Sequence, residues 1–368
     1  MTSIPTVITR GPALEAAAAR LARAPRLALD TEFLRERTYL AELALIQLSD
    51  FTHIELVDPL TELDLAPLVA LLRDAALTKV LHAARQDIEV LLPLTGVPLA
   101  PLVDTQIAAA LLGMPAQIGY GDLIARELGH TLEKSQARTD WTRRPLSRAQ
   151  LEYAADDVRW LLPLAERLEE RLAARGRLGW LAEDCAALAD PGLYRADPAD
   201  AWQRLKGIES LAPAEQQRLR SLAAWRELRA ARRNLPRGWV LADEALRAIG
   251  RAAPADVAAL KALGVMPPSA ADKLGPDIIA ELARAAGLPL EGLLQRADAR
   301  PSREEQALTR RLSERLRAVA LELDVAPEVL ATQRDLRRIA RGDPLPAVLR
   351  GWRARVLSAP LGEETARG

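Results

Sequence analysis

Two carboxylates at the end of a predicted buried strand constrain this chain most. Leu27, Leu29 and their neighbours predict a short strand over residues 26–33, which ends in Asp30 and Glu32. Because successive strand side chains point to opposite faces, these two carboxylates project to the same side. Burying them together unpaired is costly, and a divalent cation, which prefers oxygen ligands, removes that cost. The alternative is that the two carboxylates simply lie in solvent at the end of the strand. A metal site is favoured only if further carboxylates from elsewhere in the chain join them.

Predicted strands and helices divide the chain into a mixed front part and an all-helical remainder. Runs of strand character occur at residues 5–10, 26–33, 43–49, 53–58 and 79–82. They come first as a meander and then alternate with helices, which predicts a mixed α/β sheet flanked by helices. A capping box at Ser147–Gln150 begins a predicted helix that runs to about residue 175, with Pro163 as a point of kinking.

Turn-rich sequence marks the domain boundaries. The tract at residues 189–198 contains two Asp-Pro pairs and is the best boundary in the chain. We therefore predict an α/β domain at residues 1–190, followed by all-α bundles at residues 203–288 and 298–362. The two bundles are similar enough to suggest a diverged internal duplication.

Cysteine content and charge exclude several classes of protein. The single cysteine, Cys185, excludes an intrachain disulfide framework and a Cys-rich zinc site. The sequence contains no signal-peptide pattern and no run of about 18 apolar residues, so we expect a cytoplasmic protein without a membrane partner. Residues 1–195 carry an acidic excess and the remainder a basic one. The acidic front part is suited to binding metal ions, and the basic remainder is suited to binding a polyanion.

Further acidic residues lie far along the chain from the first pair. Asp87 falls in the first turn of a predicted helix, where an isolated Asp is a routine partner of the helix dipole. Tyr153 and Asp157 are four apart and share one face of the capped helix, a pair that is usually surface decoration when it stands alone. Asp156 is rotated by about 100° and points elsewhere.

The ordered set of these acidic residues and Tyr153 resembles the three exonuclease motifs of the DEDD superfamily, tyrosine subgroup. The flanking sequence resembles the ribonuclease D family at Leu45–Leu48, Asp104–Ala108, Thr139–Leu146 and Trp202–Gly207. This resemblance implies a ribonuclease H-like fold for the front domain. It implies HRDC (helicase and ribonuclease D C-terminal) domains for the bundles, of which the second matches weakly and is inferred from family architecture.

The resemblance also implies an active site. It assigns the metal-binding carboxylates to Asp30, Glu32, Asp87 and Asp157. Tyr153 corresponds to the tyrosine that orients the attacking water, a role that fits an ordinary tyrosine pKa near 10 better than bulk base catalysis. The implied cofactors are two divalent metal ions, Mg²⁺ or Mn²⁺, which clamp the attacking and leaving oxygens of a phosphodiester.

Several other residues are candidates for nucleic-acid binding, each with a structural alternative. Phe33 contacts the terminal nucleotide or belongs to the core, and His82 contacts a phosphate or is a satisfied structural histidine. The basic connection that carries Lys134, Arg138, Arg143 and Arg144 grips the RNA backbone or is simply solvated. Arg226, Arg229 and Arg233, at i, i+3 and i+7, form a phosphate-binding stripe or an ordinary solvated face.

The expected function is that of a 3′–5′ exoribonuclease that releases nucleoside 5′-monophosphates, with tRNA 3′ ends as the substrate that the family implies. The expected partner is RNA with a free 3′ end, acted on by a monomer without an obligate protein partner. A 3′–5′ DNA exonuclease is one alternative, because HRDC bundles also accompany DNA helicases. A non-catalytic RNA-binding scaffold is another, but it would require a missing ligand, and all four carboxylates are present. Many members of the family that this chain resembles have Asn near Ala83 or Gly near Ala84, whereas this chain has Ala at both positions. This difference bears on the fine positioning of the scissile nucleotide and not on the metal ligands.

Overall fold

A computed structural model describes residues 6–133, 136, 139–195, 197–290, 293 and 301–366. It forms two compact units. Unit 1 lies within residues 1–34, 42–194 and 302–368, and unit 2 within residues 35–41 and 195–301. The helices after residue 302, predicted as a separate bundle, thus belong to the same compact unit as the α/β part. Within the described residues, no helix combines the length and apolar character needed to cross a membrane.

Unit 1 is built on a six-stranded sheet in the order β1-β4-β3-β2-β5-β6. The strands are β1 (Val7–Ile8), β2 (Arg26–Leu34), β3 (Glu42–Ser49), β4 (Ile54–Val57), β5 (Thr78–Leu81) and β6 (Leu102–Asp104). The β2–β3 and β3–β4 pairs are antiparallel, and the β1–β4, β2–β5 and β5–β6 pairs are parallel. The longest strand, β2, is therefore central, and the predicted mixed sheet is confirmed.

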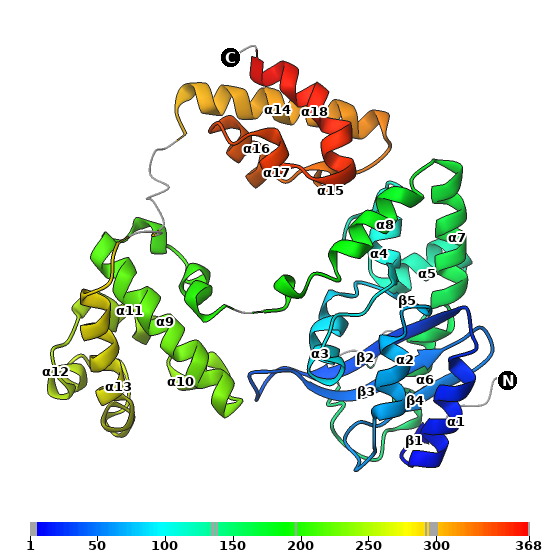
Figure 1. Cartoon of the computed structure of the whole chain (residues 1–368), viewed down its shortest axis with the longest axis horizontal. Helices are drawn as coiled ribbons and strands as arrows, with labels where there is room; N and C mark the ends of the chain where they lie inside the picture. The colour runs from blue at the N-terminus through cyan, green and yellow to red at the C-terminus, as the bar shows by residue number, and fades with distance from the viewer. Residues whose placement is uncertain are drawn as a thin grey trace. The chain divides into compact units, whose positions relative to one another are not determined.

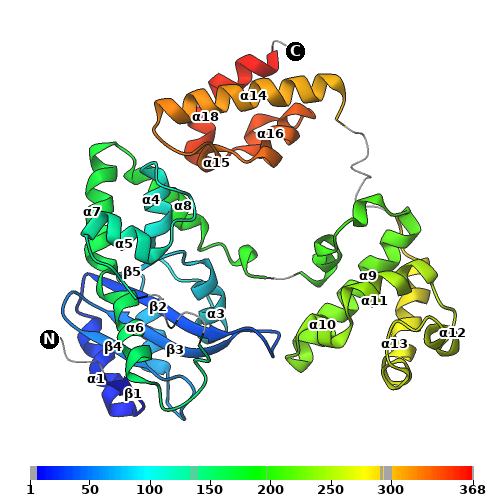
Figure 2. The ribbon, with the colours of Figure 1, turned by 180° about the vertical axis from the view of Figure 1, so that it is seen from behind.

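Helices cover both faces of this sheet (Figures 1 and 2). On one face lie α1 (Gly11–Leu21), α2 (Ala66–Arg73) and α3 (Arg85–Thr95), and on the other α6 (Arg148–Arg159) and α7 (Leu161–Ala174). Leu27 and Leu29 of β2 pack in the core of the first face, whereas Ala28 packs against Val158 and Leu162 on the second. Both faces of β2 are buried, which explains its continuous apolar run.

The predicted helix to residue 175 is two helices, with the break at Trp160 between α6 and α7. Pro163 explains the break. Its nitrogen cannot donate to the carbonyl of Arg159, and its ring would clash with that carbonyl in a continuous helix. Three further helices complete the α/β part, namely α4 (Thr105–Leu111), α5 (Tyr120–Leu128) and α8 (Leu178–Ala187).

The C-terminal helices of unit 1 pack against α8. They are α14 (Arg303–Glu322), α15 (Pro327–Leu330), α16 (Gln333–Ala340), α17 (Leu345–Val348) and α18 (Gly351–Ala366). The indole of Trp352 stacks on that of Trp180, with ring centroids 4.2 Å apart and planes inclined by 6°. Arg353 adds a bidentate pair with Asp184, at 2.5 and 3.0 Å. This bundle is therefore joined to the α/β part by apolar and ionic contacts.

Unit 2 is helical. It begins with two 3-10 turns, Pro198–Arg204 and Ile208–Ser210. Its helices are α9 (Pro213–Arg233), α10 (Arg237–Val240), α11 (Asp243–Ala252), α12 (Val257–Ala262) and α13 (Pro268–Ala286). Trp202 and Leu219 lie in its apolar core with Leu246 and Ile278. The predicted helical bundle after the turn-rich tract is confirmed, whereas the number of HRDC domains stays a prediction.

Candidate active site

Three carboxylates from two elements meet at one end of β2. Asp30 and Glu32 project from the same face of the strand, and Asp157 reaches them from α6, which crosses that face. One oxygen from each of the three lies within 4.8 Å of the other two. Ser147 and Gln150 form the predicted capping box at the start of α6, which fixes the start of this helix. Chain segments far apart in sequence thus place three acidic groups within reach of one cation.

The fourth predicted ligand, Asp87, approaches from the opposite side. It lies in the first turn of α3, is buried, and accepts a hydrogen bond of 2.5 Å from the Thr31 hydroxyl. Thr31 stands between Asp30 and Glu32 but points to the other face of β2. Asp87 is outside the group of three mutually close oxygens, although its charge raises the pKa of Asp30. The structure therefore places it beside the cluster, held by a threonine that sequence reasoning missed.

Burial and mutual repulsion disfavour the ionised forms of these groups. Burial, and then the charges of Asp87, Asp157 and Glu32, hold the pKa of Asp30 well above its usual range. Burial is also the main cause that raises the pKa of Glu32 to about 9, that of Asp157 to about 8 and that of Asp87 to about 6. A site that destabilises four negative charges is one that a bound divalent cation stabilises. Because carboxylate oxygen is a hard donor, the site suits Mg²⁺ or Mn²⁺.

These pKa shifts predict a pH-dependent stability. Between the ordinary carboxyl pKa near ~4 and the value of about 9 for Glu32, the folded protein binds more protons than the unfolded chain. The stability of the metal-free protein should therefore fall as pH rises through this window. Added Mn²⁺ should raise the melting temperature more at pH 8 than at pH 5, because protons compete with the cation. Thermal unfolding with and without Mn²⁺ checks this, and an equal shift at both pH values would contradict it.

Tyr153 lies one turn before Asp157 on α6 and faces the same cluster. Burial, followed by the charges of Asp157, Glu32 and Asp30, raises the pKa of its hydroxyl. The ring of Trp141 lies 5.9 Å from that of Tyr153, which helps to fix its orientation. The phenol therefore stays protonated and can donate a hydrogen bond over the carboxylates.

A second tyrosine, Tyr120, also lies beside the cluster. It begins α5, and burial followed by the charges of Asp157 and Asp30 raises the pKa of its hydroxyl. The hydroxyl donates to the carbonyl oxygen of Asp156 at 3.3 Å. Sequence reasoning missed this residue because no carboxylate motif lies near it in the chain.

His82 and Phe33 differ in their surroundings. The Nδ1 atom of His82 lies 2.9 Å from the Thr105 hydroxyl, and its Nε2 atom lies 3.0 Å from the carbonyl oxygen of Ile118. Burial lowers its pKa, so the neutral ring is favoured. Both nitrogens are thus engaged by the protein, which supports the structural alternative. Phe33 is half-buried on β2 beside Glu32.

The two alanines after His82 adopt a strained turn. Ala83 has a φ of 57°, in the left-handed region that Asn tolerates better than Ala. The carboxylate of Asp104 accepts hydrogen bonds from the backbone amides of Ala83 and Ala84, at 3.1 and 2.8 Å. These bonds hold the turn that leads into α3 and Asp87.

The predicted basic connection is only partly described. Lys134 and Arg138 lie outside the described residues. Arg143 is 84% exposed and pairs with Asp140 at 3.4 Å. Arg144 is structural, because it pairs with buried Asp58 at 2.5 Å and donates to a backbone carbonyl of β3.

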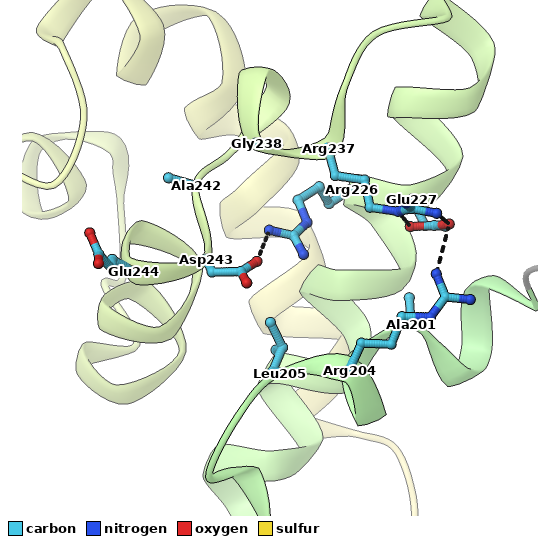
Figure 3. Close-up of a pocket in the computed structure, with 10 residues that line it drawn as sticks. All are labelled: Ala201, Arg204, Leu205, Arg226, Glu227, Arg237, Gly238, Ala242, Asp243 and Glu244. Atoms are coloured by element: carbon cyan, nitrogen blue, oxygen red, sulfur yellow. Dashed lines mark hydrogen bonds and ion pairs between the residues drawn. The ribbon is translucent and has the colours of Figure 1, made fainter. Parts of the chain in front are cut away.

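The predicted arginine stripe on α9 needs a correction. Arg226 is buried, and its Nη1 donates to the carbonyl oxygen of Leu241 at 2.8 Å. The same Nη1 donates to Asp243 at 2.7 Å (Figure 3). Its side chain joins α9 to the start of α11, so it is not available for phosphate. Arg229 pairs with Asp277 at 2.6 Å, and Arg233 is exposed.

Figure 3 shows the cavity that Arg226 borders, which has a volume of about 490 Å³. On its other side, buried Glu227 accepts a hydrogen bond of 2.7 Å from Arg237 and lies 3.6 Å from Arg204. These partners lower the pKa of Glu227 against the opposing effect of burial, which is the largest single influence. The charges in this cavity thus neutralise one another.

A second cavity of unit 2, about 530 Å³ in volume, lies between α9 and α13 and is lined by four arginines and by the two acidic residues Asp277 and Glu281. Its lining includes Arg229, Arg232, Arg233 and Arg284 beside Trp225 and Leu228. Arg229 lies over the ring of Trp225, with the guanidinium carbon 5.6 Å from the ring centroid. Arg229 and Arg233 of the predicted stripe thus line this cavity. Arg232 and Arg284, which the sequence analysis did not single out, line it with them.

Comparisons with known proteins agree with this architecture. A family model for the 3′–5′ exonuclease domain matches residues 5–173, and one for the HRDC domain matches residues 215–282. Ribonuclease D from Granulibacter bethesdensis is 41% identical over 359 residues, covering 95% of this chain and 89% of that protein. Ribonuclease D from Gluconacetobacter diazotrophicus is 42% identical over 362 residues, with coverages of 96% and 90%.

The same relationship holds in three dimensions. The crystal structure of Escherichia coli RNase D, described as an exoribonuclease involved in structured RNA processing, matches with a TM-score of 0.89 at 32% identity. The match covers 100% of this chain and 99% of that one. The sheet and the HRDC region are therefore those of a shared architecture, and the chain belongs to the ribonuclease D family of metal-dependent 3′–5′ exoribonucleases.

Proposed function

We propose that this exoribonuclease trims the 3′ ends of tRNA precursors, using two divalent cations, Mg²⁺ or Mn²⁺, held by Asp30, Glu32, Asp87 and Asp157. The observation that carries the site assignment is the convergence of three carboxylates from β2 and α6 within 4.8 Å. The hydrogen bond from Thr31 to Asp87 supports the inclusion of the fourth ligand. Asp30, whose pKa is raised by the charges of all three other carboxylates, would hold a cation together with them.

The chain's own groups then supply binding and orientation. When bound, the cations stabilise the charge that develops on the phosphodiester and help to ionise the attacking water. Tyr153, whose raised hydroxyl pKa keeps it protonated, donates a hydrogen bond that orients this water for in-line attack. Phe33 contacts the terminal nucleotide from β2, beside Glu32. The products are a nucleoside 5′-monophosphate and an RNA shortened by one residue.

A comparison of matched RNA and DNA oligonucleotides with 5′ labels and free 3′ ends tests the function. We expect a ladder of RNA products shortened one nucleotide at a time with Mg²⁺ or Mn²⁺, and none with EDTA. A tRNA precursor with a 3′ extension should be trimmed to a discrete end. Preferential degradation of DNA would favour the alternative of a DNA exonuclease, and no degradation of either would overturn the proposed site.

The accessory parts complete this proposal. We propose an exonuclease domain at residues 1–190, an HRDC domain at residues 203–288 and a degenerate HRDC-like bundle at residues 298–362, in a monomer without an obligate protein partner. Lys134 and Arg143 are proposed to contact the RNA backbone, whereas the hydrogen bonds of His82 and the burial of Arg226 speak against such a role for these two.

We further propose that the basic cavity between α9 and α13 binds the RNA backbone. Its exposed Arg232 and Arg233 are suited to phosphate, whereas Arg284 is paired with Glu281, and Trp225 offers an aromatic face. The double variant Arg232→Ala/Arg233→Ala should weaken RNA binding and reduce the slope of log affinity against log salt by about 0.7 for each lost contact. Titration of RNA at several salt concentrations measures both quantities.

The matched control is Arg251→Ala, which removes an exposed arginine of α11 that is 73% exposed and pairs with Glu215. Point substitutions are preferable to a truncation after residue 202, because residues 302–366 pack with the α/β part of unit 1. An equal affinity loss in the control would indicate a general charge effect and would contradict a specific role for the cavity.

A further inference from the structure

Gln47 occupies a position on β3 directly opposite Asp30. The antiparallel register of β2 and β3 pairs the two residues, and that of β3 and β4 places Leu56 on the other side of Gln47. Directly opposed residues point to the same face of an antiparallel sheet, with Cβ atoms about 4.5–5.5 Å apart. The side chain of Gln47 therefore leaves β3 next to that of Asp30, on the face that α6 covers.

The side chain of Gln47 is fully buried, at 0% relative exposure. Neither its Oε1 nor its Nε2 has a hydrogen-bond partner among the residues that the structure describes. The other buried residues of β3 up to Leu48 are aliphatic, and a leucine of similar volume would avoid leaving a polar group unpaired. A buried amide at this position is therefore explained best by a partner that it gains in another state of the site.

The chemistry of the neighbouring group identifies that partner. An ionised carboxylate only accepts hydrogen bonds, and a carboxamide nitrogen is a donor of matching geometry. Metal-binding carboxylates are themselves oriented by such donors in a surrounding layer of the protein. The register supports this pairing, because it places the two side chains on the same face of the sheet as directly opposed neighbours.

We propose that Gln47 is a positioning residue, whose carboxamide Nε2 donates to Asp30 when this carboxylate ligates a divalent cation and thereby fixes its orientation. This inference rests on the proposed function, because it takes Asp30 as a ligand. It adds a residue that neither the acidic motifs nor the tyrosine motif contains. The effect of Gln47 on the reaction is indirect, through the direction in which the Asp30 oxygens point.

Isothermal titration of the full-length protein with Mn²⁺, without RNA, tests this role. Gln47→Leu keeps the volume and removes the donor, and Gln47→Met provides a more flexible replacement if the leucine does not fit. Both variants should bind Mn²⁺ about 10–100-fold more weakly than the wild type, while the metal-free melting temperature stays equal or rises. Cleavage of RNA by the variants should need more Mn²⁺ for half-maximal rate.

Ser49→Ala is the matched control, because Ser49 lies two residues further along the same face of β3, and its hydroxyl bonds the carbonyl oxygen of Asp50 at 2.6 Å. It should bind Mn²⁺ like the wild type. Wild-type Mn²⁺ affinity in Gln47→Leu or Gln47→Met would overturn the inference and leave the proposed function intact. A wild-type protein that neither binds Mn²⁺ nor degrades RNA would instead overturn the proposed function.

Discussion

Replacement of Asp30 by Asn should abolish metal-dependent RNA degradation. The cleavage rate should fall by more than the factor of about 10–100 that is typical for residues that hydrogen-bond a metal ligand without binding the metal themselves. Asn preserves the shape of the side chain but removes the charge that binds the cation. Because Asp30 is destabilised in its ionised form by burial and by three neighbouring carboxylates, the substitution should leave the metal-free fold intact or stabilise it. Asp157→Asn should have the same effect, because this residue completes the close group of three oxygens.

The measurement combines single-turnover cleavage of a labelled RNA with thermal unfolding. Asp156→Asn is the matched control: it neighbours Asp157, but its carboxylate pairs with Arg159 at 2.8 Å. It should retain activity within a few-fold of the wild type, as expected for a partly exposed ion pair. Full activity in both Asp30→Asn and Asp157→Asn would contradict the assignment, whereas inactivity with a collapsed melting temperature would point to unfolding.

The parts of the site that follow local geometry could be predicted from the sequence. Strand alternation places Asp30 and Glu32 on one face, and helical periodicity places Tyr153 and Asp157 one above the other. Both rules hold whatever the tertiary structure is. They do not say that α6 crosses the face of β2 from which the first two carboxylates project, and this came from the resemblance to a known family.

The parts that depend on packing across the sheet could not be predicted in this way. The Thr31 hydroxyl supports Asp87 only because α3 lies on the opposite face of the sheet from α6. Tyr120 is placed near the cluster by α5, and Gln47 is placed opposite Asp30 by the β2–β3 register, and no local pattern specifies either position.

The prediction that Arg226 binds phosphate was wrong for a different reason, because the sequence does contain a pattern that indicates its burial. Arg226 falls in phase with the buried positions of α9, which include Leu219, Leu222, Ala223 and Ala230. The spacing i, i+3, i+4, i+7 and i+11 marks the face of a helix that meets the core. An arginine on this face is expected to be paired internally, as its bonds to Leu241 and Asp243 show. Charge alone was a poor guide to exposure.

Replacement of Trp352 by Ala should destabilise unit 1 by about 3–5 kcal/mol, the range for truncating a large buried aromatic side chain. Trp352 is 1% exposed, stacks on Trp180, and donates from Nε1 to Asp184 at 3.0 Å. The substitution removes the ring stack, opens a cavity and removes the hydrogen bond from the indole to Asp184. Because α8 also contacts β6, the loss should extend to the α/β part.

Urea unfolding followed by circular dichroism measures this effect, with Trp239→Ala as the matched control. Trp239 is 64% exposed on α10, so its removal should change the free energy of unfolding by less than about 0.5 kcal/mol. Trp352→Phe separates the two contributions, because it keeps an aromatic contact with Trp180 but loses the hydrogen bond to Asp184.

A Trp352→Ala protein with wild-type stability would mean that the C-terminal helices do not depend on this contact. The deletion of residues 302–366 should then leave the exonuclease fold intact, whereas the packing of Trp352 on α8 predicts that this deletion exposes an apolar surface and lowers the melting temperature.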